Sequence, residues 1–226
     1  MSKLKTAFPY IDVHTHRLPS EEGVLSVYNL LLHETSAFPE VPFSAGLHPW
    51  YAGELSTKTL SRSLDQCAKS QDMIAFGETG LDKACNIPMQ LQQDIFELHL
   101  RKAVELRKPL VIHCVKAWEE LIEISAGYPI RMILHGYNGS AQLTDHLLQK
   151  GFLFSVGKAI LDPRSKIHQS IRRIPPTAIL CETDNSNVSI QDIYAGLCAS
   201  LDIEEAELKE TIFNTFARLI SHYAKV

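Results

Sequence analysis

The sequence lacks the features that mark membrane and secreted proteins. No apolar run approaches the roughly 18 residues that a helix needs to cross a bilayer. The first residues, Met-Ser-Lys-Leu-Lys-Thr-Ala, do not have the pattern of a secretory signal. The five cysteines are scattered and form no CxxC pair, so neither a zinc ribbon nor a thioredoxin-like redox site is indicated. We therefore expect a cytoplasmic protein with free thiols.

An excess of positive charge is also missing. Lys and Arg total 22 against 26 Asp and Glu, which gives a formal net charge of −4. A protein that coats duplex nucleic acid needs a basic surface to release counterions, so binding to a long duplex should be weak. Bound metal ions can supply positive charge for a phosphate instead, so enzymes that act on phosphates are not excluded.

The chain has no linker, internal repeat or low-complexity tract, and we expect one domain over residues 1–226. Its fold class is indicated by short apolar runs rich in branched side chains, at 10–13, 24–32, 42–47, 73–76, 109–112, 130–134, 152–156 and 178–181. Such runs are typical of parallel strands covered on both faces, and helical patterns separate most of the later ones. We predict an α/β fold, a single (β/α)8 TIM-type barrel, although an open doubly wound sheet has the same rhythm.

The first third of the chain departs from this rhythm. Segments 15–23 and 33–41 are short and contain Pro19 or Pro39, so neither can hold more than about two helical turns. We therefore predict a distorted barrel in which the helices after the first two strands are shortened or missing. The second strand would then be covered by loops, by the C-terminal helices, or by another subunit in a homo-oligomer. Further along, Asp162 and Pro163 predict the start of a helix.

Metal-ligand residue types recur at the carboxyl ends of these runs. His14 and His16 form an HxH pair at the end of the first run, and residues two apart on a strand share a face. Glu78, His113 and His135 each follow a later run, and Asp184 follows the last. Barrel enzymes carry their chemistry at this end of the strands. The sequence therefore predicts that these side chains meet at one face of the barrel.

The repetition favours a metal centre, although one histidine at a strand end is more often a hydrogen-bonding residue than a ligand. Four imidazoles and two carboxylates suit divalent Zn, Mn, Ni, Co or Mg. They exceed one tetrahedral site and suffice for two ions that share a bridging carboxylate. His48 also follows a strand, and we expect it either to contact substrate or to pack its loop. Asp82 and Glu182 lie close to expected ligands, and each would either orient a ligand or make a purely structural bond.

Five other histidines lie in helical or connecting segments, and we expect them to be structural: His33, His99, His146, His168 and His222.

At these residues the sequence resembles the TatD-like metal-dependent deoxyribonuclease family of the amidohydrolase superfamily. The resemblance rests on segments spread along the chain: Ile11-Asp12-Val13-His14-Thr15-His16, Gly46-Leu47-His48-Pro49, Phe76-Gly77-Glu78-Thr79-Gly80-Leu81-Asp82, Val111-Ile112-His113, Leu134-His135-Gly136-Tyr137-Asn138-Gly139-Ser140, Leu180-Cys181-Glu182-Thr183-Asp184 and Asn214-Thr215-Phe216-Ala217-Arg218-Leu219. The Gly-Glu-Thr-Gly-Leu-Asp and Glu-Thr-Asp segments, in this order and spacing, make it specific.

The resemblance implies a metal-dependent hydrolase that cleaves nucleic-acid phosphodiester bonds with a water activated by two ions. His14, His16 and Asp184 would hold one ion, and His113 and His135 the other, with Glu78 bridging. Asp184 and Glu78 would be the catalytic carboxylates, and Asp184 would also accept the proton of the attacking water. His48 and Lys116 are the candidates for phosphate or leaving-group contacts.

The sequence departs from the family where the family contacts substrate. Val115 stands where an Arg is common, Tyr137-Asn138-Gly139 replaces an aromatic-Ser-Gly segment, and Ser186 replaces a Pro. Two alternatives therefore stay open: an amidohydrolase that uses the same site on an amide, ester or lactone, and a barrel that keeps metal only for structure.

Overall fold

The computed structural model describes residues 8–221, apart from 19–20 and 35–36. Its eight strands are β1 (Tyr10–Thr15), β2 (Val24–Leu31), β3 (Phe43–Gly46), β4 (Met73–Asp82), β5 (Leu110–Val115), β6 (Met132–Leu134), β7 (Leu153–Val156) and β8 (Ile179–Cys181). Strands that are consecutive in sequence pair in parallel, in the order β1 to β8. All eight predicted strands are confirmed, and the sheet curls into a nearly closed TIM-type barrel.

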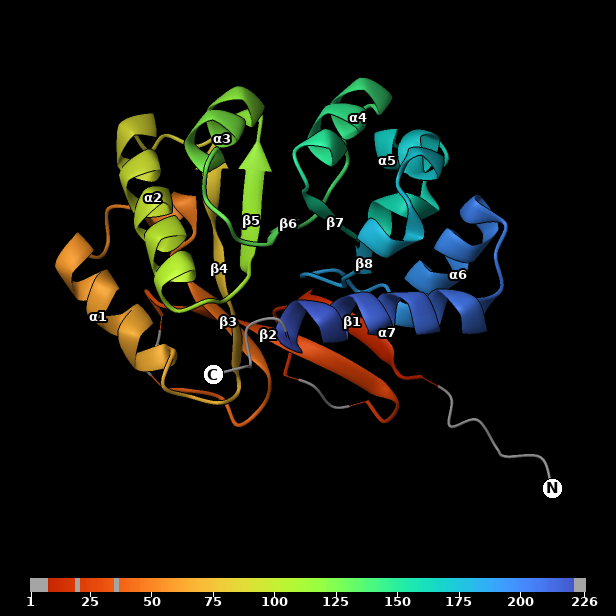
Figure 1. Cartoon of the computed structure of the whole chain (residues 1–226), viewed down its shortest axis with the longest axis horizontal. Helices are drawn as coiled ribbons and strands as arrows, with labels where there is room; N and C mark the ends of the chain where they lie inside the picture. Colours follow the sequence, from red (N-terminus) through yellow and green to blue (C-terminus); the bar gives the residue numbers. More distant parts are fainter. Residues whose placement is uncertain (1–7, 19–20, 35–36, 222–226) are drawn as a thin grey trace.

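Helices surround most of the barrel (Figure 1). The α-helices are α1 (Thr57–Cys67), α2 (Met89–Glu105), α3 (Trp118–Ser125), α4 (Ala141–Gln149), α5 (Lys166–Ser170), α6 (Ile190–Leu201) and α7 (Glu205–Ser221). Short 3₁₀ helices are η1 (Pro49–Tyr51), η2 (Lys158–Leu161), η3 (Ile171–Arg173) and η4 (Pro176–Ala178). None of the helices in the described part of the chain is long and apolar enough to cross a membrane.

The missing early helices are confirmed for the described residues. Between β1 and β2, and between β2 and β3, those residues form only turns, bends and extended chain. Val24, Leu25, Tyr28 and Leu31 of β2 are half-buried, and α7 packs against β1 and β8 (Figure 1). The C-terminal helix therefore covers β1, which no helix directly follows among the described residues.

The predicted helix start at Asp162 and Pro163 is wrong. Helix α5 begins at Lys166, where the Ser165 hydroxyl accepts a hydrogen bond from the His168 N–H. The Asp162 carboxylate instead accepts from the main chain and side chain of Arg164, which holds a turn. An Asp side chain can cap a helix or hold a turn, and Asp162 holds a turn here.

The barrel closes between its first and last strands only at the carboxyl edge. Thr15 and Asp184 form an isolated parallel bridge, in which the Asp184 N–H donates to His14 O (2.9 Å) and the His16 N–H donates to Asp184 O (3.3 Å). Nearer the amino end, the Tyr194 hydroxyl of α6 accepts from the Ile11 N–H at 3.0 Å and contacts the Ile11 carbonyl at 3.3 Å. A tyrosine side chain therefore satisfies main-chain groups of β1 that a strand partner would otherwise pair.

Candidate metal centre

The strands extend further toward the site than the sequence predicts. His14, Glu78 and His113 lie inside β1, β4 and β5 rather than after them, whereas His135 directly follows β6. Two glycines permit this path in β4. Gly77 and Gly80 have φ of +109° and +150°, and a Cβ at either would collide with a carbonyl oxygen of β5. Glycine at these positions lets β4 approach β5 closely on both sides of Glu78.

Glu78 lies at the centre of the cluster and is buried. Its Oε2 atom is 3.4 Å from His14 Nε2 and 3.9 Å from His16 Nε2. Asp184 completes this side, with Oδ1 3.4 Å from His16 Nε2 and 3.8 Å from His14 Nε2. The barrel closure brings Asp184 there, because its main chain is hydrogen-bonded to β1 on both sides of Thr15.

The other oxygen of Glu78 faces a second group of imidazoles. Oε1 lies 2.8 Å from His135 Nε2, 3.1 Å from His113 Nδ1 and 3.3 Å from His48 Nε2. His113 Nδ1 and His135 Nε2 are themselves 3.2 Å apart. The two oxygens of one carboxylate therefore divide the cluster into two halves, and His48 belongs to the second half.

The cluster has the donor geometry that a divalent ion needs. Three groups of ligand atoms lie within 4.8 Å of one another: His14, His16 and Asp184; His14, Glu78 and His135; His48, Glu78 and His113. Ligand atoms on opposite sides of one ion are about 4.2 Å apart when each bond is about 2.1 Å. His14 is fully buried, and neither of its ring nitrogens has a hydrogen-bond partner among the described residues. A buried imidazole without a partner is costly, and a metal ion would satisfy it.

Two carboxylates and one side-chain amide contact the residues of the cluster from outside it. Asp82 Oδ2 is 3.1 Å from His113 Nε2, and Glu182 Oε1 is 3.3 Å from His135 Nδ1. Such contacts fix the orientation and tautomer of a ligating histidine. Asn29 on β2 holds Glu78 twice: its Nδ2 donates to Oε2 at 3.1 Å, and its Oδ1 accepts from the Glu78 N–H at 3.0 Å.

The carboxylates and imidazoles of the cluster shift one another's pKa values toward the charged forms. Burial alone would raise the pKa of Glu78, but His135, His113 and His14 hold it well below its usual range. Burial likewise would lower the pKa of His135, but Glu78 and Glu182 hold it well above its usual value. The cluster is thus built around a permanent carboxylate that is available to cations.

Asp184 is the more accessible carboxylate, with 42% of its side chain exposed. Burial acts to raise its pKa, but the hydrogen bond with His16 and the charges of His135 and His14 lower it below the ordinary value. A cavity of about 190 Å³ adjoins Asp184 and is lined by Lys158 and Ser186, among others. The Ser186 hydroxyl is buried and has no hydrogen-bond partner among the described residues.

The structure places the remaining sequence candidates as follows. Lys116 is exposed, has a left-handed backbone with φ of +56°, and lies outside the imidazole cluster. It lines a groove of about 740 Å³ between α3 and α4, together with Lys83, Trp118, Gln142 and His146. His99 is fully buried and hydrogen-bonded to main chain, as expected of a structural histidine. His222 lies outside the described residues.

Sequence reasoning missed Asn29 and Trp50. Asn29 is a buried polar residue in a mostly apolar run, and that position was an available signal. Trp50 gives no comparable signal, because its contact with Asp82 depends on how η1 sits against β4.

Comparison with known proteins identifies the family. The family model described as TatD related DNase matches residues 25–221. The chain belongs to this family, as the sequence resemblance predicted.

Similar proteins include nucleases and an uncharacterized metal-dependent hydrolase. The chain is 35% identical over 161 residues to the human 3'-5' RNA nuclease TATDN2, covering 68% of this chain and 21% of that protein. It is 32% identical over 157 residues to an uncharacterized metal-dependent hydrolase from Buchnera aphidicola, covering 65% and 60%. It is 32% identical over 147 residues to the 3'-5' ssDNA/RNA exonuclease TatD of Erwinia tasmaniensis, covering 62% and 56%. The aligned regions thus span about a fifth of the human protein and a little over half of the two bacterial relatives.

Solved structures share the fold. The TatD homologue YJJV of Escherichia coli superposes with a TM-score of 0.83 at 23% identity, covering 94% of this chain and 98% of that one. The fold of a TatD family hydrolase from Entamoeba histolytica is also similar, with a TM-score of 0.77 at 14% identity, covering 95% and 98%.

Proposed function

We propose that this protein is a metal-dependent phosphodiesterase that hydrolyses nucleic acid at the Glu78 centre. One observation carries the proposal: the two oxygens of a single buried carboxylate face two separate groups of imidazoles. This arrangement suits a carboxylate that bridges two divalent ions. The nuclease names of the human and Erwinia relatives support nucleic acid as the substrate.

The residues present fit two ions. His14, His16 and Asp184 would hold one, His113 and His135 the other, and Glu78 would contact both. The donor set suits divalent Zn, Mn, Ni or Co, and Mg is also compatible with its carboxylates. When bound, such ions lower the pKa of a coordinated water and neutralise charge on a phosphate oxygen.

Asp184 is the proton acceptor in this proposal. Its lowered pKa keeps the carboxylate ionised at neutral pH, and its exposed side chain can reach an incoming water. Glu78 is buried and fully engaged with imidazoles, so it serves as a fixed negative charge between the two halves.

His48 and Lys116 are the proposed substrate contacts. His48 Nδ1 accepts a hydrogen bond from the Trp50 N–H, so the proton of the neutral ring lies on Nε2, which faces the cluster. An N–H at that atom can donate to a phosphate or leaving-group oxygen. Lys116 directly follows β5, and its groove begins where β4 and β5 end beside the cluster. Its ammonium group would contact a second phosphate of the bound nucleic acid, beyond the phosphate at the cluster.

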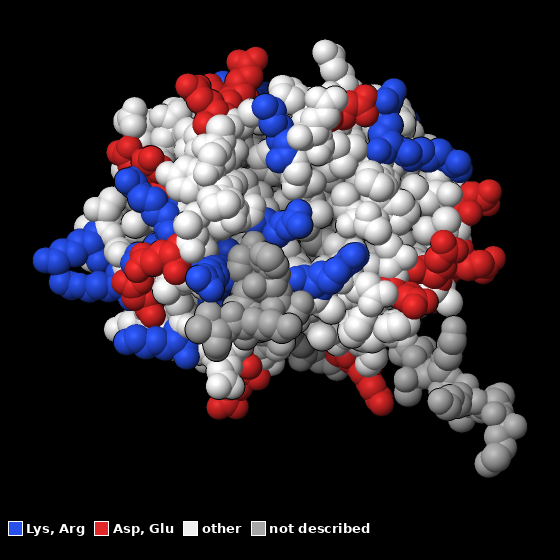
Figure 2. Space-filling model, viewed as in Figure 1, with Lys and Arg blue, Asp and Glu red and all other residues white. Residues whose placement is uncertain are grey.

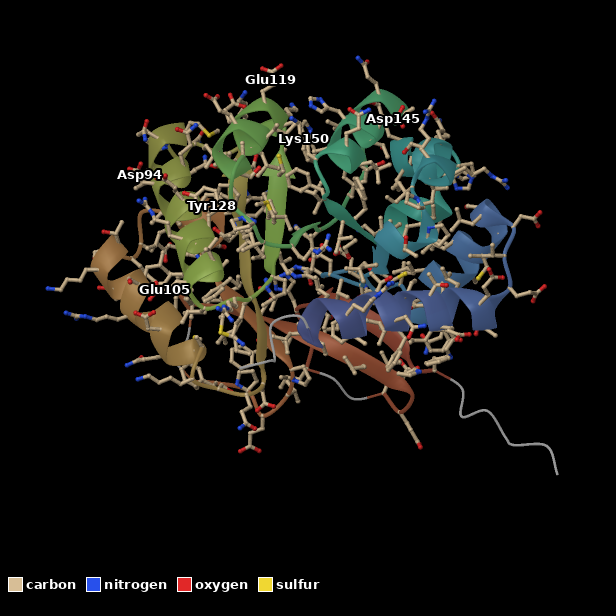
Figure 3. The ribbon with its side chains drawn as sticks, in the orientation of Figure 1. Asp94, Glu105, Glu119, Tyr128, Asp145 and Lys150 are labelled. Carbon is tan, nitrogen blue, oxygen red and sulfur yellow. The ribbon has the colours of Figure 1, made fainter. Side chains whose placement is uncertain are left out.

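The surface charge favours short or single-stranded substrates. In the view of Figure 2, basic side chains are interspersed with acidic and neutral ones rather than gathered into one continuous surface. Figure 3 shows Glu119 at the outer end of α3, pointing out of the molecule, and this residue also lines the groove of Lys116. A rigid duplex would be repelled by these acidic side chains. The free end of a single nucleic-acid strand can instead reach the Glu78 centre at the carboxyl ends of the β-strands. Weak binding to long duplex, a cytoplasmic location and a homo-oligomer covering β2 stay predictions.

A metal-restoration assay tests the proposal. Chelator-treated protein receives Zn²⁺, Mn²⁺, Co²⁺, Ni²⁺ or Mg²⁺ in turn, with end-labelled single-stranded DNA, single-stranded RNA and duplex as substrates. We expect cleavage of single strands to return with metal, and not to return in Asp184→Asn purified in the same way. Hydrolysis of a carboxyl-ester or lactone panel without any phosphodiester cleavage would instead identify the amidohydrolase alternative. Bound metal with no hydrolysis of either class would indicate a structural role for the metal.

A further inference from the structure

Trp50 is an exposed aromatic residue at the rim of the Glu78 centre. It lies in η1, two residues after His48, and 53% of its surface is exposed. Its ring centroid is 4.9 Å from that of His48 and 6.2 Å from that of His113. A large apolar ring that is left in contact with water beside a cluster of this kind has surface available for a ligand.

The ring is exposed but fixed in position. Trp50 Nε1 donates a 2.7 Å hydrogen bond to Asp82 Oδ2, and the same oxygen lies 3.1 Å from His113 Nε2. Asp82 is itself buried and held by the Ala84 N–H, which donates to its Oδ1 at 2.7 Å. The indole is therefore tied by its edge to the residues that surround the cluster, and binding against its face costs little ordering entropy.

We propose that Trp50 is the stacking platform for the nucleobase attached to the nucleotide whose phosphate is cleaved. The inference rests on the proposed nuclease function and names the part of the substrate that this residue recognises. The indole lies beside the rings of His48 and His113, with centroids 4.9 and 6.2 Å apart, so a nucleotide whose phosphate is at the cluster can place its base against the indole. Stacking accepts every base because each has a π face, so the platform favours nucleotides over base-free phosphodiesters without selecting a sequence.

Binding can be measured directly, because the chain contains only two tryptophans. The other, Trp118, is half-buried and packs edge-on against Tyr137, with ring centroids 6.1 Å apart. In Trp118→Phe, Trp50 becomes the sole source of indole fluorescence. A short phosphorothioate oligonucleotide, which resists hydrolysis, is titrated into the metal-loaded variant. Matched oligonucleotides carry an abasic residue at each position in turn.

We expect quenching of Trp50 fluorescence by the full oligonucleotide, and its loss when one particular position is abasic. Equal quenching by every abasic oligonucleotide, or none by the full one, would overturn the proposal. This titration needs no turnover. If the protein cleaves no nucleic acid, the proposed function fails, while the titration still decides whether Trp50 stacks on a base.

Kinetics separate stacking from the hydrogen bond to Asp82. Trp50→Leu removes both the aromatic face and the indole N–H, whereas Trp50→Phe keeps an aromatic face without the N–H. For a base-containing single strand we expect KM to rise roughly 5- to 100-fold in Trp50→Leu and several-fold less in Trp50→Phe. For the same strand made abasic at the position found by titration, the two variants should share one KM.

A matched control is Phe38→Leu, which removes an aromatic residue of similar exposure, 41%, that stacks on Phe43 at the opposite, amino end of β3. This variant should leave KM unchanged on both substrates. Equal losses in Trp50→Leu on the base-containing and abasic strands would mean that Trp50 only positions Asp82 and His113, and would overturn the platform.

Discussion

Asn29 gives a direct test of how the cluster is held, because its side chain makes two hydrogen bonds to Glu78. These two bonds differ in energy. The bond from Asn29 Nδ2 to the ionised Oε2 is charge-assisted and contributes about 1.5–3 kcal/mol, while the bond from the Glu78 N–H to Asn29 Oδ1 contributes about 1 kcal/mol. Asn29→Ala removes both bonds and leaves a buried N–H without a partner. We expect the free energy of unfolding of the metal-free protein to fall by about 2.5–4 kcal/mol.

The same variant should also weaken metal binding. Without Asn29, the Glu78 carboxylate can rotate away from the direction in which its oxygens face the two groups of imidazoles. Loss of a partner that orients a ligand typically reduces metal affinity by about 10- to 100-fold. Urea unfolding of metal-free protein measures the first effect, and competition with a chelator measures the second.

Ser44→Ala is the matched control. The Ser44 hydroxyl donates only a 3.4 Å hydrogen bond to Asn29 Oδ1, so its loss should cost less than about 1 kcal/mol and leave metal affinity unchanged. If Asn29→Ala shifts neither stability nor affinity more than Ser44→Ala does, the idea that Asn29 orients the bridging carboxylate is refuted.

Further predictions concern metal, turnover, substrate and pH. Gently purified protein should contain between one and two equivalents of a divalent transition metal by elemental analysis; no metal and no gain of activity on adding metal would contradict the centre. Asp184→Asn should lower turnover by at least ~10²-fold and leave the circular dichroism spectrum unchanged, and unchanged turnover would remove its role as proton acceptor. Gel shifts with long duplex should be weak and salt-sensitive, so tight binding that resists salt would count against a strand-end substrate. Burial lowers the pKa of His99 to about 4 from 6.5, so the unfolded chain binds a proton that the native chain does not between these values. Unfolding free energy should therefore be full above pH 6.5 and fall by about 3 kcal/mol as pH drops to 4, and a pH dependence in urea unfolding as steep in His99→Gln would disprove this assignment.

The strands could be predicted because their signal is local. A parallel strand buried on both faces is a nearly continuous apolar run, and each of the eight runs in this chain became a strand. The missing early helices were also predictable, since the segments before and after β2 are too short and too polar for full helices. The start of α5 was not, because Asp162 can cap a helix or close a turn, and only the position of Arg164 decides between them.

The candidate site likewise contains residues that could be predicted from the sequence and residues that could not. Ligand types at strand ends can be found from sequence, because the parallel topology brings all carboxyl ends to one face. Side chains that touch these residues from elsewhere cannot be assigned in this way. Asn29 meets Glu78 through the curvature of the sheet, and Trp50 meets Asp82 through the packing of η1, neither of which is a repeating pattern.

The bridge between Thr15 and Asp184 has a consequence for the order of assembly. It joins residues 169 positions apart, and contacts between such distant residues form late because closing a long loop costs entropy. During synthesis His14, Glu78, His113 and His135 all leave the ribosome before Asp184 does. Asp184 therefore reaches the other residues of the cluster only when the chain that follows β8 docks on β1. Until Asp184 has been made and has docked on β1, a nascent chain lacks the carboxylate that completes the cluster.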